Sequence, residues 1–442
     1  MRIQLSDHFN YNKLLRFALP SIIMMVFTSL YSIVDGFFVS NFVGKTPFAA
    51  VNLIMPVIMV LASVGFMFGA GGSALVSKTM GEGEHEKARR LFSLFVYCTA
   101  ISGVIIAVIA FIFLRPIAVL LGAEGELLNN CVIYGRILLV SLPLYMLQFE
   151  FQSFFITAEK PQLGLTVTVI CGIINMALDA LFIAGFSWGL VGAAAATAIS
   201  QVLGGVIPVI YFSRSNASLL RLTKTKFDGK ALVKACTNGS SELMSNISIS
   251  IVSMLYNIQL MKYAGENGIA AYGVLMYVNM IFLGAFIGYS TGTAPVVSYH
   301  FGAKNHSELK GLLKKSLIII GVFAVIVFVI AELLAKPLAG IFVSYDKELM
   351  EMTVRAFRIY SFSFPFASIA IYGSSFFTAL NDGLTSALIS FLRTLLIQVA
   401  AVLILPIFLK IDGIWLSVVV AEFASAIMTS LFIIVKRKKY HY

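Results

Sequence analysis

Two carboxylates lie inside stretches of sequence that are long and apolar enough to cross a lipid bilayer. Asp35 lies near the end of an apolar run that begins near residue 14, and Asp179 lies in another run, 163–184. A carboxylate in the hydrocarbon is costly unless it has a function or a partner. At a rise of about 1.5 Å per residue, Asp35 lies about 31 Å and Asp179 about 24 Å from the inner ends of their spans. Both are therefore expected in the outer half of the membrane.

Two further polar residues reach a similar depth. Asn175 lies one turn before Asp179, and Thr197 enters its span from the outer side. Two carboxylates in a site of low dielectric constant cannot both be charged easily, so one is expected to hold a proton unless a cation such as Na⁺ replaces it. The four residues predict a proton or sodium switch. The alternative, in which Asp179 only accepts hydrogen bonds from its neighbours, stays open.

A second set of polar residues lies in the other half of the chain, in the apolar run 231–262. The residues recur at spacings of 4, 4, 3 and 4, which places them on one face of a helix. Such a face is expected to line water or another polar surface. The stripe consists of Glu242, Asn246, Ser250, Ser253 and Asn257.

Three charged residues are expected near the midplane of the membrane. They are Arg393 in the run 384–407, Glu422 in the run 412–436, and Glu242. An unpaired arginine at that depth is expensive, so Arg393 is expected to pair with Glu422 or Glu242 as a structural ion pair. A carboxylate left over from this pair, for which Glu242 is the candidate, is available to meet a cationic substrate or to take part in ion coupling. Glu150, seven residues from the inner end of its span, is expected to reach the surface by snorkelling or to meet Lys160, with a functional role as the alternative.

The amino-acid composition of the whole chain is that of a membrane protein. Of 442 residues, 59% are hydrophobic and 12% are charged, with a mean hydropathy of +0.93. A water-soluble protein of this size does not need so large a share of hydrophobic residues to form its core. An all-α membrane protein is therefore predicted. Windows of about 19 residues give twelve spans, at 14–39, 48–74, 91–114, 133–157, 163–184, 190–212, 231–262, 268–298, 313–335, 353–378, 384–407 and 412–436.

The positive charges indicate how the spans are oriented. With the N-terminus inside, the inner segments hold 22 Lys and Arg residues and the outer segments hold 9. This obeys the positive-inside rule and explains the net charge of +11 without nucleic acid. Both termini are predicted to be cytoplasmic. The first apolar run is too long for a signal-peptide core, so it is expected to remain as the first span.

An internal repeat organises the chain. Gly71, Ser77 and Gly81 match Gly292, Ser298 and Gly302 at an offset of 221 residues, and Arg136 and Pro143 match Arg358 and Pro365 at 222. Six spans per copy is an even number, so both copies enter from the same side and are related by an axis along the membrane normal. The predicted domains are a six-helix bundle at 1–212, a cytoplasmic linker at 213–230 and a second six-helix bundle at 231–442.

Three sequence patterns resemble enzyme or metal-site motifs but do not meet the requirements of those sites. The GYSTG sequence at 288–292 fits a nucleophile motif but lies in an apolar helix, where small residues pack helices together. The HEKAR sequence has Arg89 where a zinc protease needs its second histidine. The four cysteines have no metal-ligand spacing. We therefore expect no catalytic residue, metal or cofactor.

Taken together, the residues resemble those of the multidrug and toxic compound extrusion (MATE) transporters, particularly the bacterial branch with DinF-like and MepA-like proteins. The resemblance covers the whole chain. It depends on four features: FALP followed by SIVDGFFV, NMALDALFI, GLVGAAAATAIS, and the duplicated GGSALVSKTMG and GTAPVVSYHFG.

The resemblance implies two six-helix bundles in a V shape that alternates between outward-open and inward-open states. It implies export of cationic, often aromatic, compounds in exchange for H⁺ or Na⁺. It also implies that Asp35 is the cation-coupling carboxylate, with Asn175, Asp179 and Thr197 as partners, and that Pro20 is the bending point of the first helix. The second-bundle acids of some branches are only partly matched, because Glu242 lies closer to the inner end and the tenth span has no acid.

The protein is therefore predicted to be an antiporter that acts as a monomer and exports small organic cations. Its predicted location is a bacterial cytoplasmic membrane. A flippase for a lipid-linked precursor is the alternative, although a phosphate substrate would call for a more cationic cavity than these acid-bearing spans provide. A gated channel is a third possibility, which electrical recording separates from exchange.

Overall fold

A computed structural model describes residues 3–344 and 346–442, without the side chains of Ser40, Asn41, Lys45 and Phe342. The described chain is almost entirely helical. The first half contains α1 (Tyr11–Phe38), η1 (Val39–Val43), α2 (Lys45–Gly81), α3 (His85–Leu120), α4 (Gly125–Thr157), α5 (Pro161–Asp179), η2 (Ala180–Gly185) and α6 (Gly189–Ser213). The second half contains α7 (Gly229–Gly302), α8 (His306–Val343), α9 (Lys347–Ser361), α10 (Phe364–Ala379), α11 (Gly383–Phe391), η3 (Leu392–Leu396) and α12 (Ile397–Tyr440). The three η segments are π-helical turns.

The helices account for the twelve predicted spans. Within residues 3–344 and 346–442, nine continuous helical runs are long and apolar enough to cross a membrane. Two of these runs are two spans each, because the chain turns back sharply at Gly265 in α7 (φ 62°) and at Lys410 in α12 (φ 51°). The shorter helices α9 and α10 together form one more span, which makes twelve. The protein is therefore an all-α, multi-pass membrane protein, as predicted.

Polar residues begin several of these helices. An asparagine or aspartate side chain accepts a hydrogen bond from the backbone N–H three residues later, which satisfies a group that the helix itself leaves unpaired. These capping residues are Asn10, Asp228, Asn305, Asp346 and Asp382.

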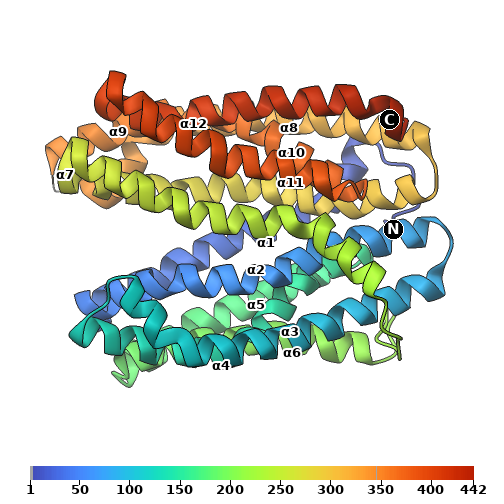
Figure 1. The fold of residues 1–442 in the computed structure, drawn as a ribbon, viewed down its shortest axis with the longest axis horizontal. Helices are drawn as coiled ribbons and strands as arrows, with labels where there is room; N and C mark the ends of the chain where they lie inside the picture. Colours follow the sequence, from blue (N-terminus) through green and yellow to red (C-terminus); the bar gives the residue numbers. More distant parts are fainter. Residues whose placement is uncertain (1–2, 345) are drawn as a thin grey trace.

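The chain folds into two bundles, α1–α6 and α7–α12 (Figure 1). In that view the bundles lie one below the other, and both termini lie at the same end. The linker between the bundles also packs at that end, against the beginning of α3. Arg89 Nε donates to Leu219 O at 2.8 Å, and the backbone N–H of Thr223 donates to Ser93 Oγ at 2.9 Å. We call this the inner end.

Duplicated glycines bring the bundles together at the inner end. A Cβ atom on Gly81 would lie 2.0 Å from the backbone oxygen of Tyr299, and a Cβ atom on Gly302 would lie 2.0 Å from that of Lys78. Gly302 and Tyr299 are the residues 221 positions after Gly81 and Lys78, so the two contacts are related by the internal repeat. Such close backbone approaches require glycine. The pseudo-twofold relation predicted from the sequence is thus visible in the interface.

The contact between the bundles continues along α2 and α1, both of which pack against α7. A Cβ atom on Gly239 of α7 would lie 1.9 Å from the backbone oxygen of Met67 in α2. Along α1 the contact with α7 reaches Ser29, whose hydroxyl donates to Met280 O at 3.1 Å. Asp35 lies six residues further along α1, about 9 Å beyond Ser29.

The segment before α1 joins both bundles at the inner end. The backbone N–H of Leu5 donates to Glu159 of the first bundle at 2.8 Å, and that of Phe9 donates to Glu308 of the second bundle at 2.9 Å. Lys315 also donates to Phe9 O. The side chains of Leu5 and Phe9 are fully buried. This segment therefore holds the inner ends of the bundles together in the present conformation.

Candidate functional site

The structure brings Asp35 and Asp179 together in the first bundle. Their side chains interact directly with each other, across the contact between α1 and α5. Asp179 is fully buried and Asp35 is 9% exposed. Among the residues that the structure describes, neither oxygen of Asp179 nor Oδ1 of Asp35 has a hydrogen-bond partner of normal geometry. The pair thus offers unsatisfied carboxyl oxygens in a site largely shielded from solvent.

Thr197 belongs to the same site, and so does Tyr134, which sequence reasoning missed. The buried side chain of Tyr134 in α4 interacts with Asp35, with Asp179 and with the hydroxyl of Thr197 in α6. Asn175 is buried one turn before Asp179, on the same face of α5. Thr197 Oγ1 and Asn175 Nδ2 also lack hydrogen-bond partners of normal geometry among the described residues. Four helices therefore contribute polar side chains to one cluster.

Both carboxylates lie next to a π-helical turn. Asp179 is the last residue of α5 and is followed directly by η2, and Asp35 lies four residues before η1. A π-helical turn shifts the backbone hydrogen bonds from i−4 to i−5, and such turns occur frequently at functional sites. Here the turns mark the outer ends of the two helices that carry the acidic pair.

The cluster has the chemistry to exchange a small cation. A buried carboxyl pair is unfavourable when both groups are charged, so binding of H⁺ or of a hard cation to their oxygens relieves the repulsion. The oxygens of Thr197, Tyr134 and Asn175 could complete such a site. That these residues couple ion movement to transport remains a prediction.

Pro20 lies in the part of α1 that packs against the second bundle. Pro20 is buried, and a Cβ atom on Gly288 of α7 would lie 2.6 Å from Cα of Ile22, two residues after Pro20. The helix continues through Pro20. Proline lacks a backbone N–H, so this turn of α1 is missing one hydrogen bond. Its role as a bending point stays a prediction.

In the second bundle, Arg393 pairs with Glu422. Arg393 Nε donates to Oε2 of Glu422 at 2.8 Å and to Oε1 at 3.0 Å, and the two side chains are 15% and 11% exposed. Arg393 lies in the π-helical turn η3, and Glu422 lies in α12. Glu242 is close enough to interact electrostatically with Arg393.

Changing Glu422 to Ala is expected to destabilise the protein by about 3 kcal/mol, because it leaves an unpaired guanidinium in a largely buried place. Thermal unfolding in detergent micelles would measure this. Asp412 offers a matched control, since its pair with Arg355 is mostly exposed (70% for the arginine) and Asp412→Ala should cost under about 1 kcal/mol. Equal effects of the two changes would contradict the prediction.

The polar stripe of α7 does not converge on one point. Asn246 donates to the backbone oxygen of Glu242 at 2.9 Å, in its own helix. Ser253 interacts with Tyr272, in the span after the turn at Gly265. Asn257 is exposed. The stripe therefore does not form a compact second site like that of Asp35 and Asp179, and its role in substrate binding remains a prediction.

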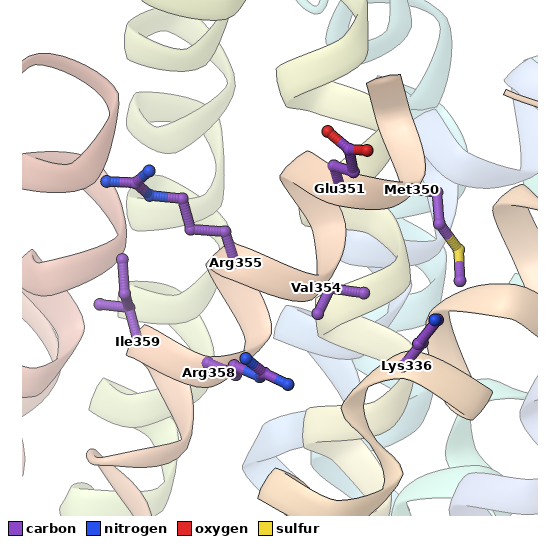
Figure 2. A pocket seen from close by; sticks show the side chains of 7 residues that line it. All are labelled: Lys336, Met350, Glu351, Val354, Arg355, Arg358 and Ile359. Atoms are coloured by element: carbon purple, nitrogen blue, oxygen red, sulfur yellow. The ribbon is translucent and has the colours of Figure 1, made fainter. Parts of the chain in front are cut away.

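A shallow groove of about 480 Å³ lies between the end of α8 and α9 (Figure 2), at the opposite end from the termini (Figure 1). In Figure 2, Lys336 lies below Met350, while Arg355 points toward another helix. Arg355 is engaged there with Asp412, at 2.6 Å. The groove contains none of the predicted site residues, so it is separate from the acidic cluster.

Comparison with known proteins agrees with this fold. The family model MatE matches twice, at residues 20–181 and 243–404, once in each bundle. The multidrug export protein MepA of Staphylococcus haemolyticus is 25% identical over 425 residues, which is 96% of this chain and 93% of that protein. MepA of Staphylococcus aureus strain MRSA252 is 24% identical over 430 residues, 97% of this chain and 94% of that protein. A crystal structure of MATE in complex with MaL6 superposes with a TM-score of 0.93 at 22% identity and covers 98% of both chains. Because the family model matches both halves of the duplicated fold, the chain belongs to the MatE family of MATE transporters.

Proposed function

We propose that this protein is a secondary antiporter that exports cationic or amphipathic organic compounds in exchange for H⁺ or Na⁺. The observation that carries the proposal is the buried pair of Asp35 and Asp179, in which Oδ1 of Asp35 and both oxygens of Asp179 lack hydrogen-bond partners of normal geometry among the described residues. The names of the relatives, multidrug export proteins, support the class of substrate.

The proposed cycle alternates between two conformations. Lys and Arg are concentrated at the end with the termini, so this inner end faces the cytoplasm of a bacterial cell. In this proposal the close glycine contacts keep that end closed, and the present conformation is the one that faces outward. In the other conformation the inner end opens, and a cytoplasmic substrate enters between the bundles.

The ion and the substrate act on each other through this conformational equilibrium. A cation taken up from outside binds the pair of Asp35 and Asp179 and changes the packing of α1, with Pro20 as the bending point. Substrate and ion must bind the two conformations with different affinities, or neither could move the other. The substrate binds between the two bundles, and a single chain contains both. A monomer is therefore sufficient for transport.

Transport by purified protein in liposomes tests this proposal. A fluorescent organic cation is supplied, and a proton or a sodium gradient is imposed separately. Accumulation of the dye against its own gradient, driven by one of the two, is the expected result. Dye movement that only equilibrates, accompanied by electrical current without exchange, would instead indicate a channel. Movement of a lipid-linked phosphate and not of the dye would indicate a flippase.

A further inference from the structure

A third carboxylate of the first bundle lies apart from the acidic cluster. Glu150 is in α4, sixteen residues after Tyr134, which places it about 24 Å nearer the inner end along the helix. Its side chain is fully buried. The expectation that it snorkels to the surface is therefore wrong, because the neighbouring helices cover it completely. Neither Oε1 nor Oε2 has a hydrogen-bond partner of normal geometry among the described residues.

Two residues of α3, Thr99 and Cys98, lie beside the carboxyl of Glu150. Thr99 in α3 interacts with the Glu150 carboxyl; it is fully buried, and its Oγ1 also lacks a partner of normal geometry in the described chain. The thiol of Cys98, also in α3, lies within electrostatic range. From α2, Gly69 faces Glu150, and a Cβ atom there would lie 3.1 Å from Glu150 Cα.

The same helix α2 also forms the inner closure. Two residues after Gly69, a Cβ atom on Gly71 would lie 2.0 Å from the backbone oxygen of Ala235 in α7. Cys98 beside Glu150 likewise lies within electrostatic range of Cys236 in α7. Helix α7 of the second bundle therefore helps to separate Glu150 from the inner face. Separation of the bundles at this point removes part of that barrier.

We propose that Glu150 is a second proton-binding site, which holds H⁺ while the inner end is closed and releases it to the cytoplasm when the inner end opens. This inference rests on the proposed function. A lone carboxylate in an apolar interior is too costly to stay charged without a partner, whereas a neutral carboxyl can remain there. The carboxyl and Thr99 together offer three oxygens, fewer than hard metal cations take, so the ligand is a proton.

Infrared spectroscopy of the protein in lipid tests the protonation directly. The wild type at neutral pH is expected to show the stretching band of a protonated carboxyl that is missing from Glu150→Gln, a change that preserves size. The band should shift in Thr99→Val, which removes the facing hydroxyl. It should weaken in Gly71→Ala, which forces the inner closure apart. Glu126→Gln, an exposed acid in α4, is the control and should match the wild type.

Transport measurements distinguish two outcomes: one in which the proposal for Glu150 is wrong, and one in which the proposed antiport function is wrong. If the wild type drives no exchange, the proposed function fails, while the infrared band still decides whether Glu150 is protonated. If the wild type exchanges, Glu150→Gln should slow proton-driven export about tenfold or more, with dye binding retained. Spectra of the wild type and Glu150→Gln that are identical in the carboxyl region would overturn the proposal. Unchanged proton-driven export by Glu150→Gln would do so as well.

Discussion

Export of an organic cation against its gradient is expected to fall about 100-fold when Asp35 is changed to Asn, the upper range of measured coupling between sites. Asparagine has nearly the same shape as aspartate but cannot gain or lose a charge. The acidic pair then no longer distinguishes the ion-bound from the ion-free state. Dye uptake by proteoliposomes under an imposed ion gradient measures the effect.

Asp179→Asn should have the same effect, and the double variant should be no worse than either single one, because the two carboxyls act as one unit. Asp412→Asn replaces a partly exposed acid of the second bundle and should export as the wild type does. Binding of the dye to Asp35→Asn should persist, which shows that the variant is folded. Undiminished uphill export by Asp35→Asn would contradict the assignment.

The second large effect is expected from a single methyl group at the inner closure. In Gly239→Ala the new Cβ atom would lie 1.9 Å from the backbone oxygen of Met67, and Cβ atoms in proteins do not approach other atoms within 3.0 Å. The helices α2 and α7 must therefore move apart by at least 1.1 Å, which disfavours the closed inner end. A change of about 5.5 kcal/mol in the free-energy difference between the closed and open inner end would turn a 99:1 ratio of closed to open protein into 1:99.

Distances between spin labels on Lys87 of α3 and Lys310 of α8 would report this change. Both side chains are exposed at the inner end, and the four native cysteines would be replaced beforehand. The distribution of distances in Gly239→Ala is expected to move to longer values. Gly321→Ala is the matched control, because no atom lies within 4 Å of the position that its Cβ would take. If Gly239→Ala and Gly321→Ala give the same distribution, the inner glycines do not control the closure.

The sequence predicted the fold well because its main signals are physical requirements of the membrane. Length and hydropathy located the twelve spans, and the offset between Gly81 and Gly302 predicted the duplicated architecture. The depth of Asp35 and Asp179, taken from the span ends alone, was enough to expect their meeting. The break between α9 and α10, at residues 362–363, lies inside one predicted span. Hydropathy does not detect this break; the local signal is Pro365 in the first turn of α10, a residue type that is common where a helix begins.

Other features depend on which helices become neighbours, and the sequence carries little signal for that. Tyr134 is one of 17 tyrosines, and only the position of its side chain beside Asp35, Asp179 and Thr197 distinguishes it. Glu150 was expected to snorkel or to meet Lys160, because its distance from the span end allows both. Burial by α2 and α3 prevents snorkelling, and neither carboxyl oxygen has a partner of normal geometry among the described residues. The π-helical turns next to Asp35 and Asp179 arise from backbone hydrogen bonds that no residue pattern specified.

Thermodynamic linkage between ion and substrate tests the central claim most directly. The dissociation constant of a fluorescent organic cation is measured for the wild type and for Asp35→Asn over a series of pH values and, separately, of Na⁺ concentrations. If the pair of Asp35 and Asp179 couples the two, the wild-type dissociation constant should rise about tenfold as the coupling ion is increased, and that of Asp35→Asn should not change. A wild-type dissociation constant that is independent of both ions, or a dependence equally strong in Asp35→Asn, would contradict the account.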